Sequence, residues 1–179
     1  MMDAFAELGL PRSPVINEDA VARQFDALSR ERHPDAGGEA AAFARLGEAR
    51  AILLSPAKRL RHLLTLLFPT EKLDGPLPPP LLDLFAALGP DLAAAKDVLA
   101  RKASAASALS RALLAPQEMA LREKLEARAE SLAARQAALL DEASRWEGQP
   151  ASLAALAREA AFLEKWQAQL RDFLARLGL

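Results

Sequence analysis

The chain has 179 residues, 51% of them hydrophobic, and its 23 Lys and Arg nearly balance its 24 Asp and Glu, which disfavours a large nucleic-acid-binding surface. The absence of Cys excludes disulfides, thiol nucleophiles and thiolate metal sites, and two His, His33 and His62, are too few for a His-rich metal site. The first residues show no signal-peptide pattern and no apolar stretch has the length of a membrane span, so we expect a cytoplasmic protein without membrane contact.

The composition predicts an all-α fold, because Ala, Leu, Glu, Arg and Gln dominate while Val and Ile are scarce and Tyr is absent. In the first half, Pro and Gly separate the predicted helices. Asn17 is a suitable N-cap for the second helix, and Ser55-Pro56 is a typical start for the fourth. The predicted helices cover residues 3–8, 18–32, 39–54 and 56 to near 69.

Four helices within residues 1–68 predict a compact small domain, and the last three of them carry apolar residues at helical spacing. The expected buried residues are Val21, Phe25 and Leu28, then Phe43, Leu46, Ala49, Ile52 and Leu53, then Leu60, Leu63, Leu64 and Leu67.

A Pro-rich segment, Gly75-Pro76-Leu77-Pro78-Pro79-Pro80, predicts a semi-rigid linker. The chain is thereby divided into residues 1–68, a linker at 69–80 and a second half at 81–179. The second half is expected to be an antiparallel helical bundle with short turns, broken at Gly89-Pro90 and at Gly148-Gln149-Pro150, and with Pro116 starting a helix. Its expected apolar stripes are Leu92, Leu99, Ala106 and Leu113, then Leu125, Leu132, Leu139 and Trp146, then Leu153, Leu156, Ala160, Leu163, Leu170, Leu174 and Leu177.

The tripeptide His33-Pro34-Asp35 stands between two predicted helices that could pack antiparallel. Pro34 ends the first of them, because the residue before a proline disfavours helical geometry. His33 and Asp35 are then expected to project from a surface loop, where Asp35 accepts charge-assisted hydrogen bonds from an arginine of a partner. Basic residues of the preceding helix form either a local positive patch or an ordinary solvated face, since Asp26 and Glu31 lie among them; they are Arg23, Arg30 and Arg32.

Together these features resemble a J-domain, the module through which Hsp40-type co-chaperones act on Hsp70. Phe25, Leu28 and Arg30 lead into the tripeptide as in the second helix of that family, and residues 46–59 resemble its third-helix signature. The resemblance covers residues 3 to about 67. Two positions depart from the family: Arg32 stands where an aromatic residue is usual, and Ala36 where Lys is usual.

The resemblance implies that Hsp70 is the partner and that the chain accelerates ATP hydrolysis by Hsp70. It implies no catalytic residue, cofactor or metal on this chain. The implied Hsp70-binding residues are His33, Pro34, Asp35, Arg23, Arg30, Arg32, Lys58 and Arg59.

Within that family the chain is most similar to the HscB/Hsc20 co-chaperones of iron–sulfur cluster assembly. Residues 5–11 and 59–66 resemble the start and the end of their J-domain, and a C-terminal bundle follows a short linker in both. Phe162-Leu163-Glu164-Lys165 looks like a segment that helps bind the cluster scaffold protein. The best positional candidate for the start of the scaffold-binding helix is Leu81-Leu82-Asp83-Leu84-Phe85, but a neighbouring part of that helix is matched equally well by Leu121-Arg122-Glu123-Lys124-Leu125.

The candidate client-binding residues are Leu82, Phe85, Phe162 and Trp166. A wide buried face is the competing and favoured interpretation of Phe162 and Trp166, because they form a stripe with Phe173. Two other functions remain open, a J-like adaptor that does not stimulate Hsp70 and a general J-protein outside iron–sulfur assembly. An enzyme is disfavoured by the lack of a Gly-rich phosphate loop and of a paired-carboxylate signature. The oligomeric state is left open.

Overall fold

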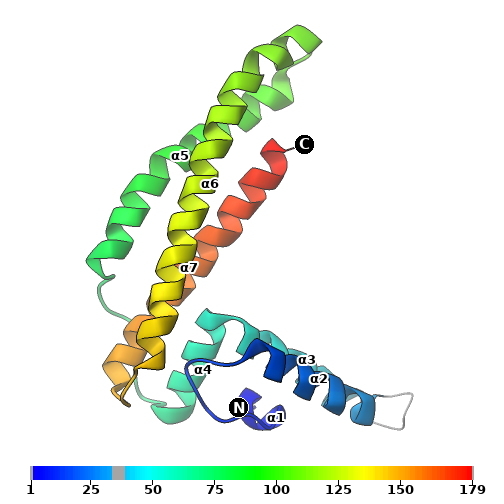
Figure 1. Cartoon of the computed structure of the whole chain (residues 1–179), viewed down its shortest axis with the longest axis vertical. Coiled ribbons are helices and arrows are strands. Elements are labelled where there is room, and N and C mark those ends of the chain that lie inside the picture. The colour runs from blue at the N-terminus through cyan, green and yellow to red at the C-terminus, as the bar shows by residue number, and fades with distance from the viewer. Residues whose placement is uncertain (1, 34–38, 179) are drawn as a thin grey trace. The chain divides into compact units, whose positions relative to one another are not determined.

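A computed structural model describes residues 2–33 and 39–178, and over these residues it contains seven α-helices and no strand (Figure 1). The all-α prediction is therefore confirmed. None of the described helices has the length and hydropathy that a membrane-spanning segment needs. The helices are α1 (Ala4–Glu7), α2 (Glu18–Arg32), α3 (Ala40–Leu54), α4 (Pro56–Leu67), α5 (Pro79–Ser104), α6 (Ala108–Ser144) and α7 (Pro150–Leu177).

The first four helices lie where the sequence predicts them, because each of their starts except that of α3 carries a local capping signal. The Asn17 side chain accepts a hydrogen bond of 3.0 Å from the Ala20 N–H at the start of α2. At the start of α4, Ser55 Oγ accepts from the Lys58 N–H at 3.1 Å, and Pro56 occupies the first turn. The Asp3 carboxylate caps α1.

Helices α2 and α3 form an antiparallel hairpin, seen side by side in Figure 1. The His33 ring, just after α2, packs edge-on against Phe43 near the start of α3, with centroids 5.2 Å apart. Earlier on α2, the Phe25 ring lies 4.7 Å from the guanidinium carbon of Arg50, near the end of α3. The end of α2 thus lies beside the start of α3, and an earlier part of α2 lies beside a later part of α3, so the two helices are antiparallel. Helices α1 and α4 also pack against α3.

The core among these helices is smaller than the apolar spacing predicts. Phe25 and Leu28 of α2 are only half-buried, and Leu67 at the end of α4 is exposed. The Phe25 ring lies under the charged guanidinium of Arg50 on α3, so this contact between the two helices is a cation–π contact. The fully buried residues are Ala4, Phe5, Leu8, Val21, Leu46, Ala49, Leu53, Leu60 and Leu63.

The second half departs from the predicted helix boundaries at two prolines. Helix α5 continues through Gly89 and Pro90, and α6 begins eight residues before Pro116 and continues through it. A proline leaves unbonded the carbonyl four residues earlier, here those of Ala86 and Ala112. Both alanines are exposed, so water can hydrate those carbonyls and the helices need not end.

The actual break lies at residues 105–107, where a reciprocal pair of hydrogen bonds starts α6. The Ser107 side chain accepts from the Ser110 N–H at 3.0 Å, and the Ser110 side chain accepts from the Ser107 N–H at 3.1 Å. The predicted stripe through Ala106 and Leu113 is therefore wrong, and Leu113 is exposed. The later stripes are largely confirmed by the burial of Leu125, Leu132, Leu139, Leu153, Leu156, Ala160, Leu163, Leu170 and Leu177.

The chain groups into two compact units, and neither is one continuous segment. The first comprises Met1–Gly75 and Leu139–Ala161, and the second comprises Pro76–Ala138 and Phe162–Leu179. Within the first unit, the rings of Phe68 and Trp146 pack edge-on at 6.3 Å, and Arg158 Nη1 donates to the Asp74 carbonyl at 2.7 Å. The end of α6 and the start of α7 thus complete the unit that holds the N-terminal helices.

Candidate functional site

His33 lies directly after α2, at the end of the α2–α3 hairpin. Its backbone is extended (φ −64°, ψ 135°), as expected for a residue that precedes a proline. The imidazole is exposed and rests against Phe43. Pro34 and Asp35, with Ala36, lie outside the described residues. The described part of the tripeptide is therefore a solvent-accessible histidine at one end of a helical hairpin.

A carboxylate from α1 lies beside this hairpin end. Glu7 Oε1 is 2.8 Å from Arg32 Nη1, at the end of α2, and 3.7 Å from Arg45 Nε on α3. The Glu7 side chain is largely buried. Arg32 is thus directed toward α1, while its neighbour His33 faces solvent. Glu7 and Arg45 are not predictable from the sequence, because no local pattern links α1 to residues on two other helices.

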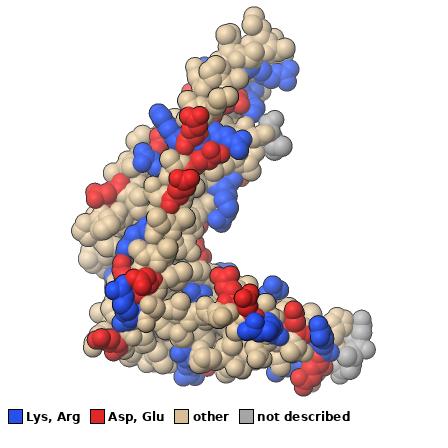
Figure 2. Space-filling model, viewed as in Figure 1, with Lys and Arg blue, Asp and Glu red and all other residues tan. Residues whose placement is uncertain are grey.

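The other predicted basic residues divide into exposed and buried ones. Arg23 and Arg30 on α2 and Lys58 on α4 are exposed. Figure 2 shows acidic atoms adjoining basic ones along this part of the molecule, as the positions of Asp26 and Glu31 on α2 suggest. Any positive field here is local and interrupted.

Arg59, in contrast, is only 3% exposed. Its Nε donates to the Pro14 carbonyl at 2.9 Å, and its Nη1 donates to the Leu53 carbonyl. These two bonds hold the loop before α2 and the end of α3 against α4. The burial of Arg59 favours a structural role over contact with a partner.

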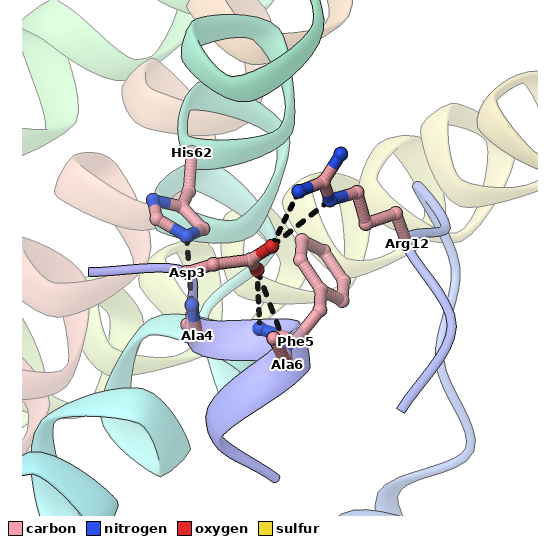
Figure 3. Close-up of polar contacts among 6 residues, drawn as sticks. All are labelled: Asp3, Ala4, Phe5, Ala6, Arg12 and His62. Carbon is pink, nitrogen blue, oxygen red and sulfur yellow. Dashed lines mark hydrogen bonds and ion pairs between the residues drawn. The ribbon is translucent and has the colours of Figure 1, made fainter. Parts of the chain in front are cut away.

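The second histidine, His62, supports the N-terminus (Figure 3). The Ala4 N–H donates to His62 Nε2 at 3.0 Å, and the His62 ring stacks on Phe5 at 6.0 Å. Burial lowers the pKa of His62, with Arg12 acting in the same direction and Asp3 and Glu48 opposing it. His62 thus connects α4 to the start of α1.

Burial alone would raise the pKa of Asp3, the N-cap of α1, but its partners outweigh this effect. Arg12 donates to the Asp3 carboxylate at 2.7 and 2.9 Å, and the Phe5 and Ala6 N–H groups donate to its other oxygen. The net effect is a lowered pKa for Asp3. Asp3 therefore stays ionised as cap and ion-pair partner.

In the second unit, three of the four predicted client-binding residues come together. The Phe85 ring of α5 stacks on Trp166 of α7 with centroids 5.5 Å apart, and Phe162 lies 5.8 Å from the same indole. Trp166 is buried, as the wide buried face predicts, whereas Phe85 is 56% exposed. Leu82 is also exposed, but it is not among the residues that line the groove beside this cluster.

The aromatic cluster forms one end of an open groove of about 380 Å³ between α5 and α7. Six of the lining residues occupy one face of α5, at spacings of three, four and seven residues from Phe85 onward. This spacing was a usable sequence signal, but the predicted break at Gly89-Pro90 obscured it. The lining residues are Phe85, Leu88, Gly89, Leu92, Ala93 and Lys96 from α5, and Lys165, Trp166 and Gln169 from α7.

Across residues 2–33 and 39–178, no group of three or more His, Asp or Glu side chains is arranged to hold a metal ion. No protein-family model matches the chain, and no curated protein matches it either. Two features with defined geometry remain: the hairpin end that carries His33, and the groove of the second unit.

Proposed function

We propose that the chain is an Hsp70 co-chaperone, which stimulates ATP hydrolysis by Hsp70 through its N-terminal helices and delivers a client in iron–sulfur cluster assembly through its second unit. The observation that carries the proposal is the antiparallel α2–α3 hairpin, with an exposed His33 at the end where His33-Pro34-Asp35 begins. This combination supports a J-domain-like role for the first four helices.

The proposed contact with Hsp70 is one of binding and requires no reaction on this chain. Asp35 would accept a charge-assisted hydrogen bond from an arginine of Hsp70, while Pro34 restricts the backbone between Asp35 and His33. Arg23, Arg30 and Lys58 are exposed and would steer an acidic Hsp70 surface toward the hairpin. Arg59 is buried and is left out of this surface.

The groove of the second unit is the proposed client-binding surface. An exposed Phe85 stacked on a buried Trp166 offers an aromatic anchor next to an open apolar floor. Such anchors contribute most of the affinity in many protein interfaces. The resemblance to the HscB family makes a cluster scaffold protein the proposed client.

The test of Hsp70 stimulation is steady-state ATPase activity of the Hsp70 from the same cell, with and without the protein. We expect the wild type to raise the rate and His33→Gln to lose most of that increase at unchanged helicity. His62→Gln replaces the only other histidine and serves as the matched control. It should retain stimulation at a temperature where the variant is folded. A His33→Gln variant as active as wild type would refute the proposal.

The Arg32–Glu7 ion pair favours one alternative, an adaptor that keeps the fold without stimulating Hsp70. Arg32 occupies a position where J-domains usually carry an aromatic residue, and the ion pair directs its side chain toward α1. If wild type and His33→Gln are equally inactive with every Hsp70 of the cell, the adaptor replaces the co-chaperone as the assigned function.

Capture from cell lysate tests the client. The full chain should be the bait, because residues 139–161 belong to the unit of the N-terminal helices and a fragment starting at residue 81 would separate them. Wild type should recover a cluster scaffold protein, and Phe85→Ala should not. Leu113→Ala, which truncates an even more exposed apolar side chain outside the groove, should behave like wild type. Equal recovery by both variants would exclude the groove.

A further inference from the structure

We propose that the α5–α7 groove binds a client segment about three helical turns long, with apolar anchors in its middle and a carboxylate near each end, and that Lys96 and Lys165 contact these carboxylates. The inference rests on the client-binding role proposed above and adds the chemistry that the groove selects.

The floor of the groove is apolar and supplies the anchoring surface. Leu88 is buried, Leu92 is half-buried, and the stacked pair of Phe85 and Trp166 closes one end. The α5 residues from Phe85 to Lys96 extend over about 16 Å at 1.5 Å per residue. A helix with anchors spaced three, four and seven residues apart fits a groove of this length.

The charged groups that line the groove are all positive. Lys96 and Lys165 are its only ionisable lining residues, and both are exposed. Neither lysine side chain forms a hydrogen bond or an ion pair with another residue in the part of the chain that the structure describes. The acids of α5 nearest to Lys96 are engaged elsewhere, Asp91 with Arg128 at 2.8 Å and Asp97 with Arg101 at 3.7 Å. The two ammonium groups are therefore available to an incoming anion.

The two lysines lie toward opposite ends of the groove. Lys165 is adjacent to Trp166, which stacks on Phe85 at the start of the α5 face, whereas Lys96 is its last residue. Helices α5 and α7 run in parallel here, since Phe85 meets Trp166 and Lys102 reaches the Leu177 carbonyl. A segment lying along the groove would thus meet one positive charge near each end. This complementarity selects acidic over basic partners.

Gly89 leaves room above the middle of the floor. A Cβ atom at this position would meet nothing within 4 Å, so alanine would fit and would be the better helix former. A long side chain there would extend into the groove. Gly89 therefore provides a means of filling the groove without disturbing α5.

The probes are three labelled synthetic helical peptides of about 14 residues, identical in their apolar anchors and carrying Glu, Gln or Lys near both ends. Fluorescence anisotropy with the full chain measures their affinities. We expect the Glu peptide to bind about tenfold more tightly than the Gln peptide, the Lys peptide to bind least, and the preference to shrink at high salt. Equal affinity of the three peptides would overturn the proposal.

Variants assign the selectivity to the groove. The double variant Lys96→Glu/Lys165→Glu should reverse the order of the peptides, whereas Lys124→Glu, an exposed lysine of α6 outside the groove, should not. Gly89→Leu should abolish binding of the Glu peptide. Ala94→Leu, at an exposed α5 position outside the lining, should leave binding intact. Binding unchanged by Gly89→Leu would place the peptide elsewhere and contradict the proposal.

The two proposals fail separately. Hsp70 stimulation that depends on His33, together with a lack of peptide selectivity, would leave the co-chaperone intact and overturn the charge selection. Selectivity that depends on Lys96 and Lys165, in a protein that stimulates no Hsp70, would support the groove inference and overturn the co-chaperone.

Discussion

Two adjacent residues at the start of α4, Lys58 and Arg59, have opposite environments. Lys58 is exposed, whereas Arg59 is buried and donates to the main-chain carbonyls of Pro14 and Leu53. The resemblance to J-domains implied that both residues bind Hsp70. The donors of a guanidinium suit it to bridging two carbonyls from different segments, which a lysine does less well.

We predict that Arg59→Leu lowers the free energy of unfolding by about 2–4 kcal/mol, because it leaves two carbonyls without their donor inside the protein. Lys58→Leu should change it by less than about 0.5 kcal/mol. Urea denaturation followed by circular dichroism measures both. An Arg59→Leu variant as stable as Lys58→Leu would contradict the structural role of the arginine.

His62 makes the stability of the N-terminal helices depend on pH. Its Nε2 accepts the Ala4 N–H, which requires an unprotonated nitrogen, and its native pKa lies below the usual 6.5. The unfolded chain therefore binds more protons between 6.5 and the lower native value. The contribution of His62 to stability is complete above pH 6.5 and is lost as the pH falls through the native pKa.

We predict that the urea midpoint of wild type falls between pH 7.5 and pH 5 by more than that of His62→Gln, which has no titrating ring. Asp3 contributes in the same direction only at lower pH, because its pKa lies below 3.8. A common pH dependence of both proteins would show that the His62 ring is equally protonated in the native and unfolded states.

At the scale of elements, helix starts with local signals are the most predictable part of the fold. The side chains of Asn17 and Ser55 cap their helices through bonds to residues three positions away, so the sequence around them contains the whole interaction. The errors occur at Pro90 and Pro116, where exposure of the neighbouring carbonyls decides whether a helix continues. Exposure of this kind depends on tertiary packing, which a local pattern does not contain.

In the candidate site, too, local features were predictable from the sequence and contacts between distant residues were not. The tripeptide and the aromatic residues Phe85 and Trp166 are recognisable as motifs or stripes. Glu7 beside Arg32, and the pairing of Phe85 with Trp166 across two helices, depend on contacts between distant parts of the chain. Lys96 was missed because the α5 face was divided at the wrong place.

The break between α5 and α6 offers a test of a capping element. We predict that Ser107→Ala lowers the free energy of unfolding by about 1 kcal/mol and speeds amide hydrogen exchange in the first turn of α6. Ser104→Ala, which removes an exposed hydroxyl bonded to the Arg101 carbonyl at the end of α5, should leave exchange in α6 unchanged. Equal exchange in both variants would contradict the role of the Ser107–Ser110 pair.

At the scale of the whole molecule, each compact unit combines segments that are distant in the sequence. The predicted division into residues 1–68, 69–80 and 81–179 stays a prediction. Residues 139–161 supply Trp146 against Phe68 and Arg158 against the Asp74 carbonyl, so the N-terminal helices lose these partners when the chain is cut after Gly75.

We predict that a fragment of residues 1–75 melts at least about 5 °C below the first transition of the full chain, because it lacks contacts worth about 1 kcal/mol or more. The full-length variant Trp146→Ala should show part of the same shift. Calorimetry measures both. A fragment as stable as the full chain would mean that residues 139–161 add nothing to the first unit.

Because the first unit combines residues 1–75 with residues 139–161, it cannot be completed early in synthesis on the ribosome. On a ribosome, residues 1–75 emerge long before residue 161, and at typical synthesis rates the interval is on the order of ten seconds. During that time the surfaces that later meet Trp146 and Arg158 stay open. The first unit is thus completed only after residue 161 has emerged, and until then those surfaces are open to contacts with other chains.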